Sequence, residues 1–345
     1  MKPSQVVQEL EIILSAGLSA FIRGAPGIGK STVVKDYALD RDLDFRDIRA
    51  AQLDPVDARG VPIADISKKL TSWLPPDFLP SAGKGILFLD ELNRANRDTQ
   101  SALYQLILDG RVGDYVLPFG WDIVAAGNRE IDGAMVQPMA RPLKNRFIHL
   151  EMTVDYEDWH KYAHKTGFDE RVIAFMHYKP SSLDELELAT KDDKGDKLDI
   201  IRNAHAFATP RSWEFVSRLI QVAMRKGRSL KDCYNLIEGT IGEGMAGEFV
   251  SYCDIYLELP DIDAAIADPA SFTPMTDPSQ LYTFCTGLAT RADKKTFGNI
   301  KKILDKIPPE YAVWTIDDCL TRNRDEIGSH PAYIEWVHKN IEYAA

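Results

Sequence analysis

Residues 24–31 read Gly24-Ala25-Pro26-Gly27-Ile28-Gly29-Lys30-Ser31. They fit the pattern G-x-x-x-x-G-K-[ST], in which a glycine-rich loop binds nucleotide phosphates. Glycines let successive backbone N–H groups approach the phosphates, and the helix that follows directs the positive end of its dipole at them. We expect Lys30 to reach the β- and γ-phosphates, the Ser31 hydroxyl to join a Mg²⁺ shell, and Thr32 to complete the nucleotide contacts.

The context of this loop supports the match. Residues 18–23 are apolar enough for a buried strand, and residues 32–39 are typical of a helix. Strand, glycine loop and helix in this order is the arrangement that the motif requires. The alternative, a glycine-rich turn without a ligand, is disfavoured because four motif positions match in the right context.

A second polar group follows the apolar run of residues 85–89. Asp90 and Glu91 come directly after it, where a strand of a parallel sheet emerges at the ligand-binding edge. We expect Asp90 to hold Mg²⁺ directly or through water, and Glu91 to orient and deprotonate the attacking water. The bland alternative is that both acids only cap a helix.

Three more strands are predicted in the part of the chain before Met152. Residues 121–127 form an apolar run that ends at Asn128, whose amide we expect at the same edge, holding the water or the γ-phosphate. Residues 146–150 resemble a fifth strand, and residues 44–50 an exposed second one. A helix is predicted at 97–109, with a hairpin-like insertion at 110–118. The fold class is therefore α/β, with five mainly parallel strands and helices between them.

Beyond Met152 helical patterns replace the strand-like runs. Residues 190–200 are predicted to form a solvated loop, and Thr209-Pro210 to open a helix. Arg211 then projects from a helix N-terminus, where a cation is unfavourable unless it faces an anion, and this conflict suggests function. A lysine cluster near residues 294–306 is interpreted as a solvated helix face rather than a surface for nucleic acid.

Composition limits the classes of function. The 345 residues carry a net charge of −11, which disfavours broad binding of nucleic acid. No apolar run is long enough for a membrane span, and the N-terminus reaches Glu9 too soon for a secretory signal. The four widely spaced cysteines indicate reduced thiols, so we expect a cytoplasmic protein.

In this order the loop, Asp90-Glu91, Asn128, Arg146 and Arg211 resemble the AAA+ ATPases over roughly residues 3–260. The resemblance implies Walker A at 24–31, Walker B at 86–91, sensor 1 at Asn128, an arginine finger at Arg146 and sensor 2 at Arg211. Arg141 is the alternative candidate for the arginine finger. It also implies an ATPase with ATP and Mg²⁺ as cofactors, built as a nucleotide-binding domain at 1–152, a helical lid at 153–260 and a helical extension at 261–345.

Within AAA+ the phrases at 90–95, 143–147 and 209–212 resemble the MoxR-type group. This likeness implies a homo-oligomeric ring, usually a hexamer, and a protein client, often one with a von Willebrand factor A domain. The implied work is remodelling or maturation of a partner complex.

Three other classes stay open at the level of residues. A motor or nuclease-associated ATPase acting on nucleic acid is disfavoured by the acidic composition. A kinase is disfavoured by Glu91 beside Asp90, which favours water as the acceptor. A nucleotide-binding scaffold would hydrolyse nothing.

Overall fold

The structure is a computed structural model of the chain, and it describes all residues except 67–68, 133–136, 187–200, 202–203, 258–259 and 341–345. The predicted loop at 190–200 thus lies outside the described residues. The described residues form two compact units, Met1–Asp155 and the part from Tyr156 onward. None of the described helices is both long and apolar enough to cross a membrane.

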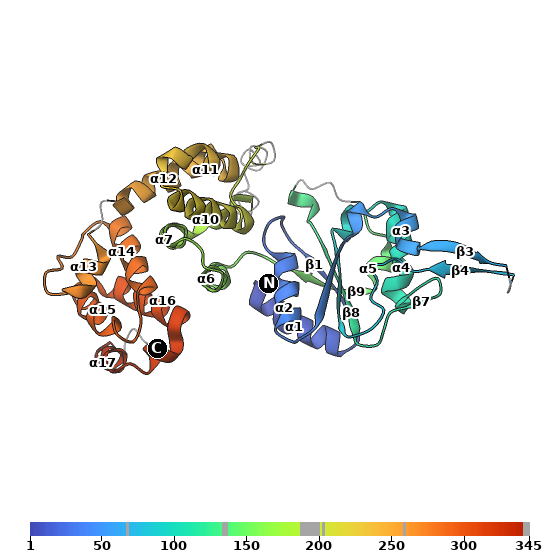
Figure 1. Cartoon of the computed structure of the whole chain (residues 1–345), viewed down its shortest axis with the longest axis horizontal. Coiled ribbons are helices and arrows are strands. Elements are labelled where there is room, and N and C mark those ends of the chain that lie inside the picture. Colours follow the sequence, from blue (N-terminus) through green and yellow to red (C-terminus); the bar gives the residue numbers. More distant parts are fainter. Residues whose placement is uncertain (67–68, 133–136, 187–200, 202–203, 258–259, 341–345) are drawn as a thin grey trace. The chain divides into compact units, whose positions relative to one another are not determined.

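The first unit is built on a five-stranded sheet (Figure 1). Its strands are β1 (Ser19–Arg23), β2 (Asp44–Arg49), β5 (Gly85–Asp90), β8 (Trp121–Gly127) and β9 (Phe147–Glu151). The order is β2-β5-β8-β1-β9 and every neighbouring pair is parallel. The prediction of an α/β fold with five parallel strands is confirmed. Parallel strands join through crossovers, so their carboxyl ends share one edge.

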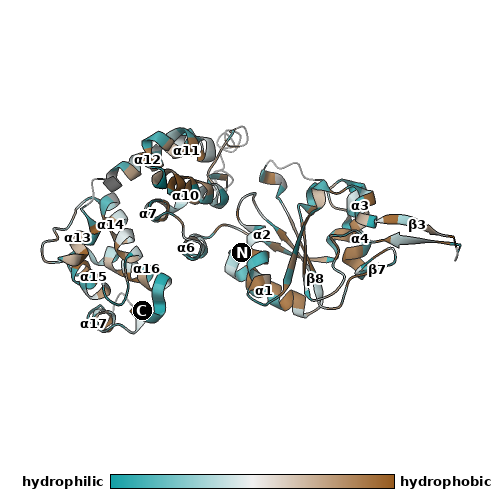
Figure 2. Ribbon diagram, viewed as in Figure 1, coloured by the Kyte–Doolittle hydropathy of each residue, from teal (hydrophilic) through white to brown (hydrophobic). Residues whose placement is uncertain are grey.

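Helices cover both faces of this sheet (Figure 1). They are α1 (Pro3–Ser15), α2 (Lys30–Leu39), α3 (Pro55–Arg59), α4 (Arg97–Asp109) and α5 (Arg141–Lys144). Leu103 and Leu106 of α4 share one hydrophobic core with Leu87 and Leu89 of β5, and Figure 2 colours these elements by hydropathy. Because side chains of a strand alternate between its faces, this core lies on one side of the sheet, and Phe88 faces the other.

Helix boundaries follow local chemistry. The predicted helix at 97–109 is α4, which Asn96 caps by accepting from the Thr99 N–H at 2.8 Å and Gly110 ends in a left-handed conformation. The first helix begins at Pro3 after an N-cap at Lys2. Proline at the first helical position sets this start, because it needs no hydrogen bond there.

Two antiparallel hairpins interrupt the first unit. The predicted insertion at 110–118 contains β6 (Arg111–Val112) and β7 (Tyr115–Val116). A longer ribbon of β3 (Val61–Asp65) and β4 (Leu70–Leu74) extends away from the sheet and was not predicted (Figure 1). The alternation signal failed here because the ribbon is exposed on both faces, so burial imposes no polar and apolar sides.

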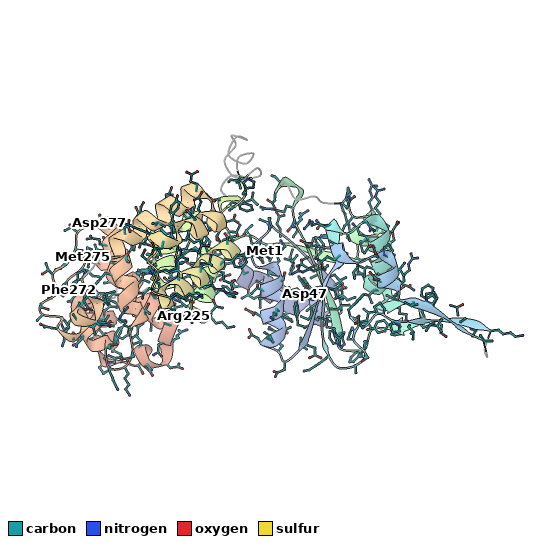
Figure 3. The ribbon with its side chains drawn as sticks, turned by 45° about the horizontal axis from the view of Figure 1, so that its top comes forward. Met1, Asp47, Arg225, Phe272, Met275 and Asp277 are labelled. Carbon is teal, nitrogen blue, oxygen red and sulfur yellow. The ribbon has the colours of Figure 1, made fainter. Side chains whose placement is uncertain are left out.

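The second unit is helical, as predicted. Among its described residues, the helices of six residues or more are α6 (Tyr156–Lys165), α7 (Glu170–Tyr178), α10 (Pro210–Arg225), α11 (Tyr234–Ile241), α12 (Glu243–Leu257), α13 (Ile262–Ala267), α14 (Pro278–Thr290), α15 (Phe297–Leu304), α16 (Pro309–Gly328) and α17 (Pro331–Lys339). Phe272 stacks on Phe284 with ring centroids 5.0 Å apart, and Met275 packs on the same core (Figure 3).

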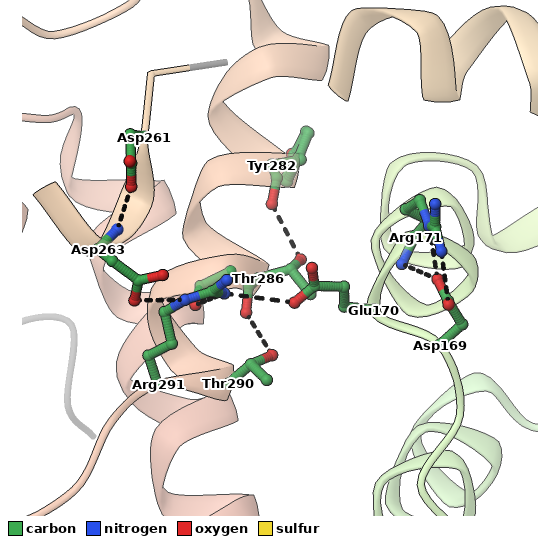
Figure 4. A network of polar contacts seen from close by, with 10 residues as sticks. Asp169, Glu170, Arg171, Asp261, Asp263, Tyr282, Thr286, Thr290 and Arg291 are labelled. Atoms are coloured by element: carbon green, nitrogen blue, oxygen red, sulfur yellow. Dashed lines mark hydrogen bonds and ion pairs between the residues drawn. The ribbon is translucent and has the colours of Figure 1, made fainter. Parts of the chain in front are cut away.

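Polar contacts connect the predicted lid to the predicted extension (Figure 4). Arg291, at the end of α14, donates from Nε to Asp263 Oδ1 at 2.9 Å and from Nη1 to Glu170 Oε2 at 3.5 Å. Helix α14 also packs on α7, α12 and α16. Both helical parts therefore belong to one compact unit of the structure, and the division into three domains stays a prediction.

The lysine cluster is not uniformly solvated. Lys301 is 8% exposed and donates to Glu335 Oε1 at 2.8 Å, while Lys306 Nζ donates to three backbone carbonyls. The interpretation as a solvated face is therefore wrong for Lys301. All four cysteines are buried and free, which fits the expectation of reduced thiols.

Candidate functional site

The loop between β1 and α2 depends on its glycines. Gly27 and Gly29 have φ of 80° and 92°, in the region that side chains disfavour. A Cβ on Gly24 would lie 2.6 Å from both the Met152 carbonyl oxygen and Ile28 Cδ1. The loop therefore requires glycine at these three positions for backbone reasons alone, before any ligand is considered.

Lys30 lies inside this loop. Its side chain is 8% exposed, and Nζ donates to the carbonyl oxygens of Gly24 at 2.9 Å and Ala25 at 2.8 Å. A third bond runs to Asn128 Oδ1 at 2.9 Å. These bonds place one ammonium group between the loop and the end of β8, so the structure brings the predicted sensor residue to the predicted phosphate-binding lysine.

Ser31 and Asp90 meet at the carboxyl edge of the sheet. The Ser31 hydroxyl donates to Asp90 Oδ2 at 3.1 Å, and the Glu91 N–H donates to Asp90 Oδ1 at 2.8 Å. Mg²⁺ binds oxygen at about 2.0–2.1 Å in an octahedron, so adjacent ligands lie about 2.9 Å apart. The Ser31 and Asp90 oxygens fit that separation, and both are oxygen donors of the kind that Mg²⁺ prefers.

Glu91 is held in an unusual backbone conformation. Its φ of 54° is left-handed, which costs a non-glycine residue about 1–2 kcal/mol. This turn directs the Glu91 side chain away from that of Asp90. There, Arg94 Nη1 donates to Glu91 Oε1 at 2.7 Å. Because both side chains are partly exposed, this ion pair is weak enough to exchange for other partners.

Asn93 is a site residue that the sequence reasoning missed. Its Nδ2 donates to the Asn128 carbonyl at 2.8 Å, and its Oδ1 accepts from the Asn128 N–H at 3.2 Å. A Cβ on Gly127 would lie 2.2 Å from Asn93 Oδ1, so glycine there makes the approach possible. The signal was an amide three residues after Asp90, on the turn that follows a central strand.

The remaining loop residues complete its shape. Ala25 and Ile28 are buried at 2% and 6% exposure and anchor the loop to the core. Pro26 is half-buried, and so is Thr32, the third residue of α2. The contribution of these four residues to nucleotide binding stays a prediction.

Arg146 lies at the opposite edge of the same sheet. It directly precedes β9, whose register with β1 pairs Phe147 with Ser19 and Glu151 with Arg23. Arg146 is therefore level with Leu18, and six rises of about 3.3 Å put it about 20 Å along the strand from Gly24, where the loop starts. Arg146 is exposed, and so is Arg141, the first residue of α5. The loop and the predicted finger of one chain are thus not brought together.

Arg211 belongs to the second unit. It is the second residue of α10, where Thr209 Oγ1 accepts from the Ser212 N–H at 3.2 Å as the predicted cap. Its side chain is exposed. A cation in the first turn of a helix has an unfavourable interaction with the helix dipole, as the sequence indicated. Its role as a lid sensor stays a prediction.

No family model matches the chain, and no curated protein matches it either. Similar solved structures include a mutant of RuvB from Thermotoga maritima, at 19% identity over 84% of this chain and 83% of that one, with a TM-score of 0.38. A putative ATPase from Cytophaga hutchinsonii shares 16% identity over 90% and 78% of the two chains, with a TM-score of 0.36. NtrX from Brucella abortus, in complex with ATP, shares 13% over 99% and 68%, with a TM-score of 0.38. Likenesses at these TM-scores do not indicate the function of this chain.

Proposed function

We propose that this chain is a MoxR-like AAA+ ATPase that couples hydrolysis of Mg²⁺-bound ATP in a homo-oligomeric ring to remodelling of a partner protein. One observation carries the proposal. The polar residues predicted from three separate sequence segments, Lys30-Ser31, Asp90-Glu91 and Asn128, meet at one edge of the parallel sheet.

Each of these side chains has a distinct task in hydrolysis. Lys30 exchanges its bonds to the loop carbonyls for phosphate oxygens, since an ammonium binds an anion more strongly than a neutral carbonyl. Ser31 and Asp90 hold Mg²⁺, which neutralises charge that develops on the transferred phosphoryl group. Glu91 leaves Arg94 and takes the proton of the attacking water. Asn128, fixed by Asn93, orients that water.

The position of Arg146 supports the ring. An arginine finger must touch the γ-phosphate, yet Arg146 lies about 20 Å along the strand direction from the start of its own loop. An exposed arginine so placed reaches a phosphate only in a neighbouring subunit. We propose a hexamer in which Arg146 completes the neighbour's site and Arg211 couples the γ-phosphate to movement of the helical unit.

The choice of client rests on the MoxR likeness alone. We propose a protein partner with a von Willebrand factor A domain, which the acidic chain binds in preference to nucleic acid. A cytoplasmic location stays a prediction.

The experiment is an ATPase assay over a range of protein concentrations. The specific activity of the wild type rises as the ring assembles. Arg146→Ala lowers turnover by about 10³–10⁵-fold while binding of a fluorescent ATP analogue survives. Arg141→Ala is the matched control, because it removes an exposed arginine five residues away. A concentration-independent rate, or a larger loss in Arg141→Ala, contradicts the assignment of the finger.

A further inference from the structure

Two histidines and an aspartate converge in the interior of the second unit, far from the residues of the nucleotide site in the sequence. His160 and His164 lie one turn apart on α6, and Asp318 comes from α16. His164 Nε2 lies 2.6 Å from Asp318 Oδ1 and 3.0 Å from His160 Nε2. His160 Nε2 lies 3.6 Å from the same Asp318 oxygen. Three donor atoms of the kinds that bind metals therefore face a common point.

The cluster is almost closed to solvent. The side chains of His160, His164 and Asp318 are 8%, 4% and 0% exposed. Burial lowers the pKa of His160 to about 4. Burying a carboxylate is costly unless a cation pairs with it, and the Arg322 guanidinium supplies one such cation beside Asp318.

Hydrogen bonds among these residues leave the cluster incompletely satisfied. A single N–H on His164 Nε2 cannot point along both close directions, toward His160 Nε2 and toward Asp318 Oδ1. Asp318 Oδ2 is buried and has no hydrogen-bond partner among the described residues. Arg322 Nε donates to Asp318 Oδ1 at 3.2 Å, but this hydrogen bond does not involve the nitrogen of either imidazole. One cation at the common point would satisfy all three facing atoms.

We propose that His160 Nε2, His164 Nε2 and the Asp318 carboxylate bind one divalent transition-metal ion, with Zn²⁺ as the preferred metal. Zinc binds imidazole nitrogen and carboxylate oxygen at about 2.0–2.2 Å in a tetrahedron, which places its ligands about 3.3 Å from one another. The three observed separations, 2.6, 3.0 and 3.6 Å, lie on both sides of this value. Asp318 Oδ2 or a water completes four donors.

The donor set selects the class of metal. Imidazole suits zinc, copper, iron and nickel, whereas Mg²⁺ and Ca²⁺ prefer oxygen alone. Two histidines four residues apart on a helix present both nitrogens on one face. Arg322 then acts in the outer shell, where its bond to Asp318 orients the carboxylate.

The consequence is mechanical. The ion connects the first helix of the second unit to a helix near the end of the chain, and α6 and α16 already pack together. A metal at this point would stabilise the predicted lid and the predicted extension as one body, independently of ATP.

The first test uses full-length, nucleotide-free wild type that has been stripped with a chelator and dialysed. On titration with Zn²⁺ we expect one tightly bound zinc per chain by elemental analysis. With Co²⁺ in place of zinc we expect the intense visible absorption of a tetrahedral ion. At zinc concentrations about 100-fold above Kd the melting temperature should rise by about 5–10 °C. Folded wild type that binds less than half an equivalent of zinc overturns the proposal.

Variants localise the metal. His164→Ala should weaken zinc binding by more than about 100-fold and abolish the cobalt absorption. His205→Ala, at an exposed position of the same unit, should bind zinc like the wild type. Zinc retained at full affinity in His164→Ala places the metal elsewhere and overturns the assignment.

Arg322→Met distinguishes a metal site from a hydrogen-bonded network and covers the case in which His164→Ala fails to fold. With a metal at the cluster, added zinc restores the melting temperature of the variant, because the ion takes over the compensation of Asp318. If only Arg322 compensates Asp318, the variant is destabilised equally with and without zinc, and the proposal is wrong.

Discussion

Ser31, Asp90 and Asn128 of the first unit lie at or just after the end of a strand or of the loop beside it, whereas His160, His164 and Asp318 of the second unit lie within helices far apart in the sequence. In a parallel sheet the backbone alone brings strand ends to one edge. In a helical unit, the residues that come together depend on which faces of the helices pack against each other. Polar groups at strand ends are therefore predictable from the sequence, and polar groups between helices are not.

Between these two clusters, the largest expected effect is at Glu91. Glu91→Gln keeps the size and the left-handed backbone of the residue but removes the base, so turnover should fall by about 10²–10⁴-fold with ATP still bound. Steady-state hydrolysis and nucleotide binding measure the two quantities separately. His160→Gln makes the same kind of change in the second unit, and we expect turnover to stay within a few-fold. Equal losses would break the distinction between the two clusters.

The next effect concerns the backbone of the loop. Gly24→Ala places a Cβ 2.6 Å from the Met152 carbonyl oxygen, and such overpacking costs about 1–3 kcal/mol. The melting temperature and the affinity for ATP should both fall. Gly239, in α11, has open space around its Cβ position, and Gly239→Ala should stabilise by about 0.5–1 kcal/mol through helix propensity. A Gly24→Ala protein that melts like the wild type would show that the loop tolerates a side chain.

The third effect tests how the site is supported. Asn93→Ala removes two hydrogen bonds to the backbone of Asn128 and leaves a buried N–H unpaired, which costs about 1–3 kcal/mol. We expect turnover to fall more than ATP affinity, because Asn128 contacts the reacting region. Asn299→Ala is the matched control, since its amide bonds the Ile266 carbonyl at 3.0 Å in the second unit. An unchanged rate in Asn93→Ala would mean that β8 alone positions Asn128.

Most of the first unit was predictable because its signals are contiguous. Apolar runs at 85–89 and 121–127 became β5 and β8, and the motif residues followed from their ends. Asn93 was missed because its task is to bond another residue's backbone, which leaves no spacing pattern. The ribbon β3–β4 was missed because neither face is buried. The cluster of His160, His164 and Asp318 was missed because the packing of α6 against α16 is a feature of the tertiary structure, and no local sequence pattern indicates it.

The smallest expected effect concerns the connection within the helical unit. Arg291 bridges Glu170 and Asp263, but its side chain is 31% exposed and Asp263 is 74% exposed, so water screens the pair. Arg291→Gln should therefore destabilise by about 0.5–1 kcal/mol, and the difference from wild type should shrink in high salt. Salt-dependent thermal unfolding measures this, and ATP turnover at saturating ATP serves as the control that should not change. Salt weakens a surface ion pair but not the packing of α14 on α7, so the response separates the two. A loss above about 3 kcal/mol that persists in salt would assign the cohesion of the helical unit to Arg291 itself rather than to its buried helix contacts.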